Sequence, residues 1–139
     1  MGFFKDVTAK YSPWKKKLSL SFMTTHVKSY SQLAESPDNV SKMKAIEKNI
    51  SGQTIHWLPK DKLPEQGLPY IKDGDIITIM TNIKGLDVAH LGFAIYVNDT
   101  LHLLHASSTE KKVVVSQLPL NLFLKSHKSW TGIRVLRVN

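Results

Sequence analysis

The stretch Gly74–Ser108, GDIITIMTNIKGLDVAHLGFAIYVNDTLHLLHASS, decides the fold and the candidate site. Its hydrophobic pattern predicts three strands, over 75–81, 90–97 and 100–107, with a loop over 83–88. Asn98-Asp99 between the last two strands is typical of a tight hairpin turn. The hairpin therefore presents His90 at the start of one strand and His105 near the end of the next.

The rest of the chain is helical and polar in its first half and β-rich in its second. In the first half we expect strands over 17–23 and 53–58 and helices over 26–34 and 37–50, the last ending at Gly52. In the second half we expect strands over 111–115 and 132–138 and a short helix over 118–125. The predicted fold class is α+β, with N-terminal helices followed by a curled, mostly antiparallel sheet, in a single domain of residues 1–139.

Composition narrows the classes of function. The 139 residues carry a net charge of +8, which favours anionic partners, but no zinc-finger, helix-turn-helix or RNP-type motif points to nucleic acid. No apolar run is long enough for a membrane span. The chain has no cysteine, which excludes disulfides, thiolate metal sites and a cysteine nucleophile within it. We expect no cofactor.

The strand that begins at His90 has an unusual face. Side chains alternate along a strand, so His90, Gly92 and Ala94 share one face, while the face of Leu91 and Phe93 reads as core. Glycine is unfavourable inside a strand unless a ligand or another backbone approaches closely. We therefore expect a vacant place over Gly92 and Ala94 for a helix that carries a nucleophile, and self-association into a homodimer through that exposed face. A surface histidine beside two small residues is the alternative.

A second polar group near His90 would orient it. His105 shares a face with Leu101 and Leu103, and His102 lies on the opposite face, so only one of these two histidines should reach His90. A bond to the Nδ1 atom of the base would fix its tautomer and stabilise the imidazolium. Which of the two histidines plays this role stays open.

Two other kinds of site are weaker. Ser107 and Ser108 lack the G-x-S-x-G elbow of serine hydrolases, which favours a role in a turn. A metal site would combine Asp87 with the hairpin histidines, but their spacing matches no established ligand pattern, so we expect no metal. The remaining histidines are scattered along the chain and are interpreted as incidental: His26, His56 and His127.

The segments His90-Leu91-Gly92-Phe93 and His105-Ala106-Ser107-Ser108 resemble the histidine half of the NlpC-type, papain-like superfamily of cell-wall cysteine hydrolases. A closer resemblance, over essentially the whole chain, is to a bacterial domain-of-unknown-function family described as N-acetylmuramoyl-L-alanine amidase-like. The resemblance implies that His90 is the catalytic base and His105 the orienting residue. We expect Asp87, Gly92 and Ser107 to contact substrate.

The same resemblance implies a missing part. In that family the cysteine lies upstream, at the N-terminus of a helix, whereas this chain resembles only the C-terminal, histidine-bearing part of such a domain. Either the chain is a truncated product, or it is a descendant that has lost the cysteine and retains only binding. The start at Phe3-Phe4-Lys5-Asp6, within family-like sequence, favours truncation.

The leading hypothesis is the histidine part of a cysteine amidohydrolase that acts on peptidoglycan peptides and is inactive as this chain alone. Its expected partner is a muropeptide, and the resemblance implies a periplasmic or extracellular location. The alternatives are a non-catalytic module that binds cell wall or another anionic polymer and, more weakly, a basic nucleic-acid-binding barrel.

Overall fold

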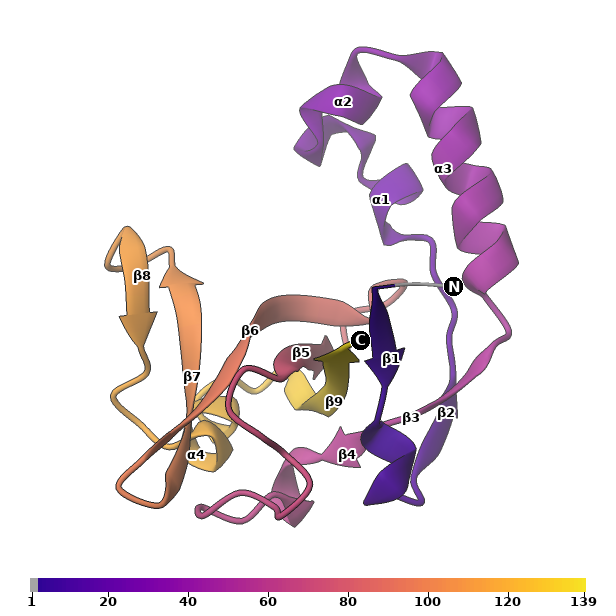
Figure 1. The fold of residues 1–139 in the computed structure, drawn as a ribbon. Coiled ribbons are helices and arrows are strands. Elements are labelled where there is room, and N and C mark those ends of the chain that lie inside the picture. Colours follow the sequence, from indigo (N-terminus) through magenta and orange to yellow (C-terminus); the bar gives the residue numbers. More distant parts are fainter. Residues whose placement is uncertain (1–2) are drawn as a thin grey trace.

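The computed structural model describes residues 3–139, and within them seven strands form one antiparallel sheet (Figure 1). The strand order is β1-β9-β5-β6-β7-β8, and β4 also pairs with β9. The bounds are β1 Phe4–Asp6, β4 Leu58–Pro59, β5 Ile76–Thr81, β6 Val88–Val97, β7 Thr100–Ser107, β8 Lys112–Val115 and β9 Trp130–Val138. A separate two-stranded ribbon pairs β2 (Lys15–Lys17) with β3 (Thr54–His56). The mixed α and antiparallel β class predicted from the sequence is confirmed.

The helices are short except for α3. Their bounds are α1 Phe22–Thr25, α2 Ser31–Ala34, α3 Pro37–Ile50 and α4 Leu120–Lys125, with 3₁₀ turns η1 Thr8–Lys10, η2 Val27–Ser29 and η3 Lys60–Lys62. The helix predicted over 37–50 is confirmed with its caps. The Ser36 hydroxyl oxygen accepts the Asn39 N–H at 3.2 Å, Pro37 opens the first turn, and Gly52 has a φ of +88°.

The β6–β7 hairpin follows directly from its turn residues. Asn98 and Asp99 have φ values of 50° and 63°, as a type I′ turn requires of both central residues. This turn fixes the register in which Val97 faces Thr100. Through the alternation along both strands, the same register also fixes which side chains of β6 and β7 share a face.

Two N-terminal predictions were wrong. The strand expected over 17–23 ends at Lys17, because Leu18 turns inward to pack with Ile55 and Met80, and the chain then starts α1 at Phe22. The helix expected over 26–34 is a series of single turns. Its backbone is interrupted at Tyr30, which adopts an extended conformation between η2 and α2.

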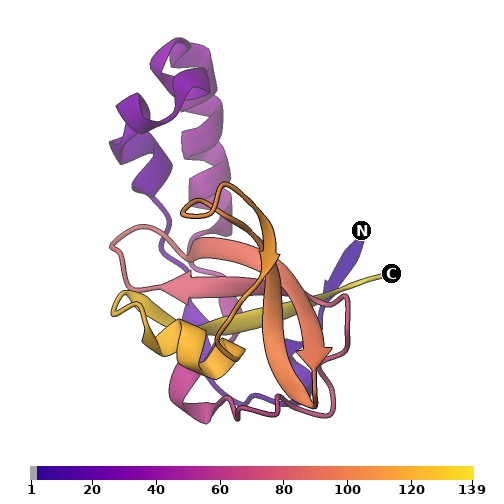
Figure 2. The same ribbon diagram turned by 90° about the vertical axis from the view of Figure 1, so that its left-hand side faces the viewer.

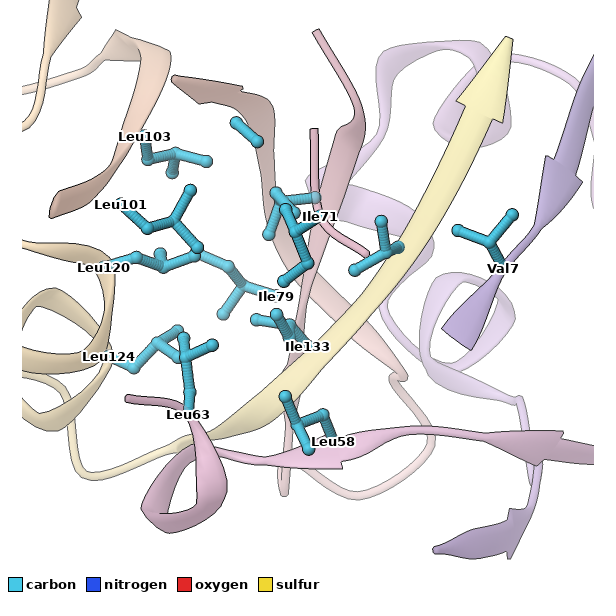
Figure 3. Close-up of a cluster of buried hydrophobic side chains, with 13 residues drawn as sticks. Val7, Leu58, Leu63, Ile71, Ile79, Leu101, Leu103, Leu120, Leu124 and Ile133 are labelled. Carbon is cyan, nitrogen blue, oxygen red and sulfur yellow. The ribbon is translucent and has the colours of Figure 1, made fainter. Parts of the chain in front are cut away.

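The main core lies on one face of the sheet, between the central strands and α4 (Figure 3). Leu120 and Leu124 of α4 are fully buried and point toward Ile79 and Leu101 of the sheet. Ala94, only 2% exposed, belongs to the same cluster. Residues that share a face with Ala94 along β6 therefore point into the core.

This arrangement reverses the prediction for β6. Leu91 and Phe93, expected in the core, are 50% and 43% exposed, whereas Gly92 and Ala94 are buried. A Cβ atom added to Gly92 would lie 2.7 Å from the Leu103 side chain and 2.7 Å from the Leu104 carbonyl oxygen. The small residues thus accommodate the neighbouring strand β7, and the face expected to be open is buried at Gly92 and Ala94.

The helices α1–α3 project from one end of the sheet, on the opposite side of the molecule from α4 (Figures 1 and 2). A second, smaller core joins them to the sheet, with Leu18, Ile55 and Met80 at its centre. The segment before β6 is also attached here, since Ser21 and Phe22 both donate their N–H groups to the Gly85 carbonyl oxygen. No helix of residues 3–139 is long and apolar enough to cross a membrane.

Candidate active site

The hairpin brings His90 and His105 into direct contact. The Nε2 atom of His90 lies 2.8 Å from the Nδ1 atom of His105, and the two rings meet edge to face. Both side chains point to the core side of the sheet, because His90 shares a face with Gly92 and His105 with Leu103. The sequence expectation that one of the two β7 histidines reaches His90 is thus met by His105.

The contact differs from expectation in the atom it uses. We expected the second histidine to bond Nδ1 of the base, but His105 meets Nε2. Within residues 3–139, His90 Nδ1 makes no hydrogen bond, so it is the ring nitrogen left to meet a reacting group. The tautomer that serves such a group carries its proton on Nε2 and donates it to His105 Nδ1.

Three aromatic rings surround the histidine pair. Trp130, at the start of β9, lies parallel to the His90 ring with centroids 6.0 Å apart, and His127 stacks on Trp130 at 3.7 Å. Phe123 of α4 contacts His105 at 5.2 Å and Trp130 at 5.2 Å. The imidazoles are therefore oriented by packing on α4 and β9 as well as by their mutual bond.

This environment favours the neutral form of His90. Burial lowers the pKa of His90 below the ordinary value of 6.5, and positive charge on His105 or His127 lowers it further. A general base has to be unprotonated before the reaction starts, so a lowered pKa suits that role at neutral and mildly acidic pH.

The other predicted site residues lie apart from the pair. His102 points to the opposite face, and its Nδ1 atom is bonded to the Ser116 carbonyl oxygen at 2.7 Å. Ser107 accepts the Glu110 N–H and so shapes the turn after β7. Asp87, before β6, lines two adjoining cavities, one formed by α1, α3 and residues 85–87 and the other by residues 16–20 and 81–87. Their expected substrate contacts, with that of Gly92, remain predictions.

Sequence reasoning assigned none of the three rings, Phe123, His127 and Trp130, to the site. His127 looked incidental, and Trp130 lay just outside the predicted last strand. The sequence pattern that could have indicated them is the spacing of three residues between His127 and Trp130, in the segment after a short helix. Only the pairing of Trp130 with Thr81 in β5 brings that segment to His90. No three histidines and carboxylates of residues 3–139 gather into a metal site.

Comparison with known proteins identifies the family. Residues 1–133 match the family described as AmiA-like, N-acetylmuramoyl-L-alanine amidase-like. The chain belongs to this family. No curated protein matches it.

Solved structures support membership in the AmiA-like family. An N-acetylmuramoyl-L-alanine amidase from Bacteroides uniformis is 59% identical, with a TM-score of 0.96 over 99% of this chain and 58% of its own. A Bacteroides fragilis protein provisionally described as a xylanase is 58% identical, with a TM-score of 0.93 over 97% of this chain and 59% of its own. Protein LPG0564 of Legionella pneumophila, at 23% identity and a TM-score of 0.58, shares the fold over 99% of this chain and 56% of its own. This AmiA-like chain thus spans less than two thirds of the length of these relatives.

One exposed apolar surface of this AmiA-like chain is the outer face of β6, β7 and β8. Leu91, Phe93 and Val113 are 50%, 43% and 67% exposed, and they border a hollow of about 250 Å³ that Leu104 also lines. By alternation the side chains of Leu91 and Phe93 point away from the face of the histidine pair, although Gly92 and His105 also line the hollow. The homodimer was expected through the face of Gly92 and Ala94, which is buried in the structure. Dimerisation itself remains a prediction.

Proposed function

We propose that this chain is the histidine-bearing part of a cysteine-type amide hydrolase of papain-like fold, which acts on peptidoglycan peptides outside the cytoplasm. Membership in the AmiA-like family supports the cell-wall substrate and the location. The observation that carries the proposal is the contact of His90 Nε2 with His105 Nδ1, which leaves Nδ1 of a half-buried imidazole with a lowered pKa for a nucleophile. The single domain of residues 1–139 is then part of a larger catalytic domain.

In the proposed mechanism His90 transfers one proton in each of two half-reactions. Its Nδ1 atom takes the proton of a thiol, and the thiolate attacks the amide carbon. The C–N bond breaks as Nδ1 donates this proton to the nitrogen of the leaving amine. Water then hydrolyses the thioester, with Nδ1 accepting a water proton and returning it to the thiol sulfur. The balance is one amide and one water converted to one carboxylic acid and one amine.

His105 stabilises the charged state in these steps. When Nδ1 of His90 is protonated, the imidazolium still donates from Nε2 to His105 Nδ1, so the hydrogen bond strengthens as the charge appears. The parallel Trp130 ring restricts rotation of the imidazole throughout. His105 and Trp130 are therefore positioning residues in this proposal, and His90 is the catalytic one.

The thiol has to come from outside these 139 residues, because the sequence contains no cysteine. A chimera tests this requirement. The part of the Bacteroides uniformis amidase that this chain does not match is fused to residues 1–139, and release of free amine from muropeptides is followed by mass spectrometry. We expect the chimera to hydrolyse the amide, to be inactivated by iodoacetamide, and to lose at least about 10²-fold in rate with His90→Ala.

The matched control is His102→Ala, which removes a histidine of the same strand pair from the opposite face. This variant should retain most of the activity, since His102 bonds only to the backbone of Ser116. Hydrolysis by residues 1–139 alone, or a chimera as active with His90→Ala as without it, would contradict the proposal. An inactive chimera in which residues 1–139 still bind muropeptides would favour a binding module instead.

A further inference from the structure

A lysine-rich surface lies around the β2–β3 ribbon and the turn η3. The segments 10–17 and 54–62 that form it contain six lysines and a single acidic residue, Asp61. They contribute five of the eight net positive charges of the chain. We call this region the basic surface, and its lysines are Lys10, Lys15, Lys16, Lys17, Lys60 and Lys62.

Backbone pairing holds the two segments of the basic surface side by side. β2 pairs with β3 so that Lys15 lies opposite His56. Beyond the ribbon, the Trp57 N–H donates to the Trp14 carbonyl oxygen at 3.0 Å. The chain then continues through β4 into η3, and β2, β3 and β4 lie next to one another, far from α2 (Figure 1). Lysines from separate elements are thus gathered on one region of the molecule.

Two tryptophan rings lie among these lysines. The Lys62 Nζ atom lies 5.6 Å from the centroid of the Trp14 ring, and the Lys16 Nζ atom lies 6.0 Å from that of Trp57. Such cation–π contacts place an ammonium group over a ring without neutralising its charge. Trp14 is nevertheless 40% exposed, so a large aromatic side chain remains in contact with water between positive charges.

The charges of the basic surface have no counter-charge in the described part of the chain. The ion pairs of residues 3–139 are made by Lys42, Arg134 and Arg137, none of which belongs to this surface. Like charges held close together repel one another, and the repulsion is relieved when an anion approaches. The basic surface therefore complements a partner that presents many negative charges.

The two rings distinguish between kinds of anionic partner. Single-stranded nucleic acid is bound by aromatic faces on which bases stack. Here an ammonium group lies over each ring, and Trp57 packs against β9, where a Cβ atom added to Gly132 would lie 2.8 Å from its Cε3 atom. A tryptophan beside lysines instead suits the surface of a bilayer, where the ring lies among the headgroups and the ammonium groups reach phosphates.

We propose that the basic surface docks on a bilayer that contains anionic phospholipid. The lysine ammonium groups contact headgroup phosphates, and Trp14 enters the headgroup region. Each basic residue near an anionic bilayer increases the affinity about fivefold, so a cluster of six supports reversible, salt-sensitive docking. This docking does not depend on the hydrolase proposal. If both hold, docking keeps the histidine pair next to a membrane.

The test measures sedimentation of residues 1–139 with vesicles. One set contains equal parts of phosphatidylcholine and phosphatidylglycerol, and the other contains phosphatidylcholine alone. We expect binding to the anionic vesicles at least about tenfold tighter than to the neutral ones. At about 1 M salt, where screening acts within about 3 Å, this binding should be lost. Equal affinity for both sets, or no binding to the anionic set, would overturn the proposal.

Charge-matched variants locate the docking surface. The test variant removes three exposed lysines of the basic surface through the changes Lys15→Gln, Lys17→Gln and Lys62→Gln. The control removes the same charge from the exposed surface of the α1–α3 segment through Lys28→Gln, Lys44→Gln and Lys48→Gln. We expect the test variant to bind anionic vesicles at least about tenfold more weakly than the control does. Equal affinities would reduce the effect to net charge and refute the assigned surface.

Trp14 separates a bilayer from a soluble polyanion. Anionic vesicles with acyl chains brominated near the headgroup should quench the tryptophan fluorescence of the unmodified chain. Trp14→Phe is a conservative change at an exposed position, and we expect most of this quenching to disappear in the variant. Equal quenching in both proteins would contradict the docking geometry. Binding of heparin or single-stranded DNA at these lysines, without binding to vesicles, would overturn the choice of a bilayer.

Discussion

Replacement of Gly92 by alanine tests whether the face of β6 that carries His90 is open or is packed against β7. If the face were open, the added methyl would stabilise the protein by about 0.4–1 kcal/mol, because alanine lowers the entropy of the unfolded chain. In the structure the methyl would instead lie 2.7 Å from Leu103 Cγ and Cδ1 and 2.7 Å from the Leu104 carbonyl oxygen. Overpacking of this kind costs typically about 1–3 kcal/mol, so the two descriptions differ in sign.

The assay is urea unfolding at pH 7, followed by circular dichroism, in a double-mutant cycle with Leu103→Ala. The Leu103 change alone should cost about 2–5 kcal/mol, since this side chain is fully buried. In the double variant the new methyl enters the space that Leu103 has left, so we expect a favourable coupling of about 1–2 kcal/mol. The contact with the Leu104 carbonyl oxygen persists, which keeps part of the Gly92→Ala penalty.

Gly74→Ala is the matched control for this cycle. Gly74 has a φ of +88°, and a Cβ atom added there would have no neighbour within 4 Å, so alanine costs about 1–2 kcal/mol through backbone strain alone. That cost should add to the cost of Leu103→Ala without coupling. Stabilisation by Gly92→Ala, or strict additivity of Gly92→Ala with Leu103→Ala, would refute the packing described for this face.

Two further predictions concern charged groups. His127→Gln removes a positive charge that lowers the pKa of His90, so the NMR titration of the His90 ring should shift to higher pH. His26→Gln, in the distant segment that carries α1–α3, should leave this titration unchanged. Burial alone would raise the pKa of Asp75, but the two hydrogen bonds from Arg137 and one from the Lys72 N–H hold it below 3.8. The stability from ionised Asp75 is therefore complete above about pH 3.8 and lost as the pH falls through its lower folded value. Asp75→Asn should lower the free energy of unfolding by about 1.5–3 kcal/mol at pH 7. The variant should also lack the acid-dependent part of the urea midpoint. An equal loss of stability at low pH in the unmodified chain and the variant would contradict this.

The sequence predicted those features that depend on interactions between residues near one another in the chain. The Asn98-Asp99 turn was predictable because both residues tolerate a positive φ, and the turn sets the register of the hairpin. Alternation along β7 predicted that only one of His102 and His105 reaches His90, and the structure shows that it is His105. Ser36 and Gly52 marked the ends of α3 for the same reason, since caps depend on residues within one helical turn.

The faces of β6 could not be assigned in this way. One face offers Leu91 and Phe93 and the other offers Gly92 and Ala94, so hydrophobicity favours the wrong face for the core. The assignment depends on α4, whose leucines lie far along the chain and cover the face with the small residues. Close approach of β7 then requires those residues to be small, and that requirement is a property of the folded sheet.

The ring cluster around His90 limits what a segment that carries the nucleophile would have to contribute to the site. His105 and Trp130 contact the His90 ring, and His127 stacks on Trp130. In the proposed mechanism these contacts position the imidazole before a thiol arrives. A segment that supplied the thiol would need to place one sulfur atom near His90 Nδ1, without reorganising the base. On this reasoning the rate of a complemented enzyme depends mainly on how firmly that segment docks. Substitutions in the exposed face of Leu91 and Phe93 should then leave the titration of His90 unchanged, whether or not they weaken docking.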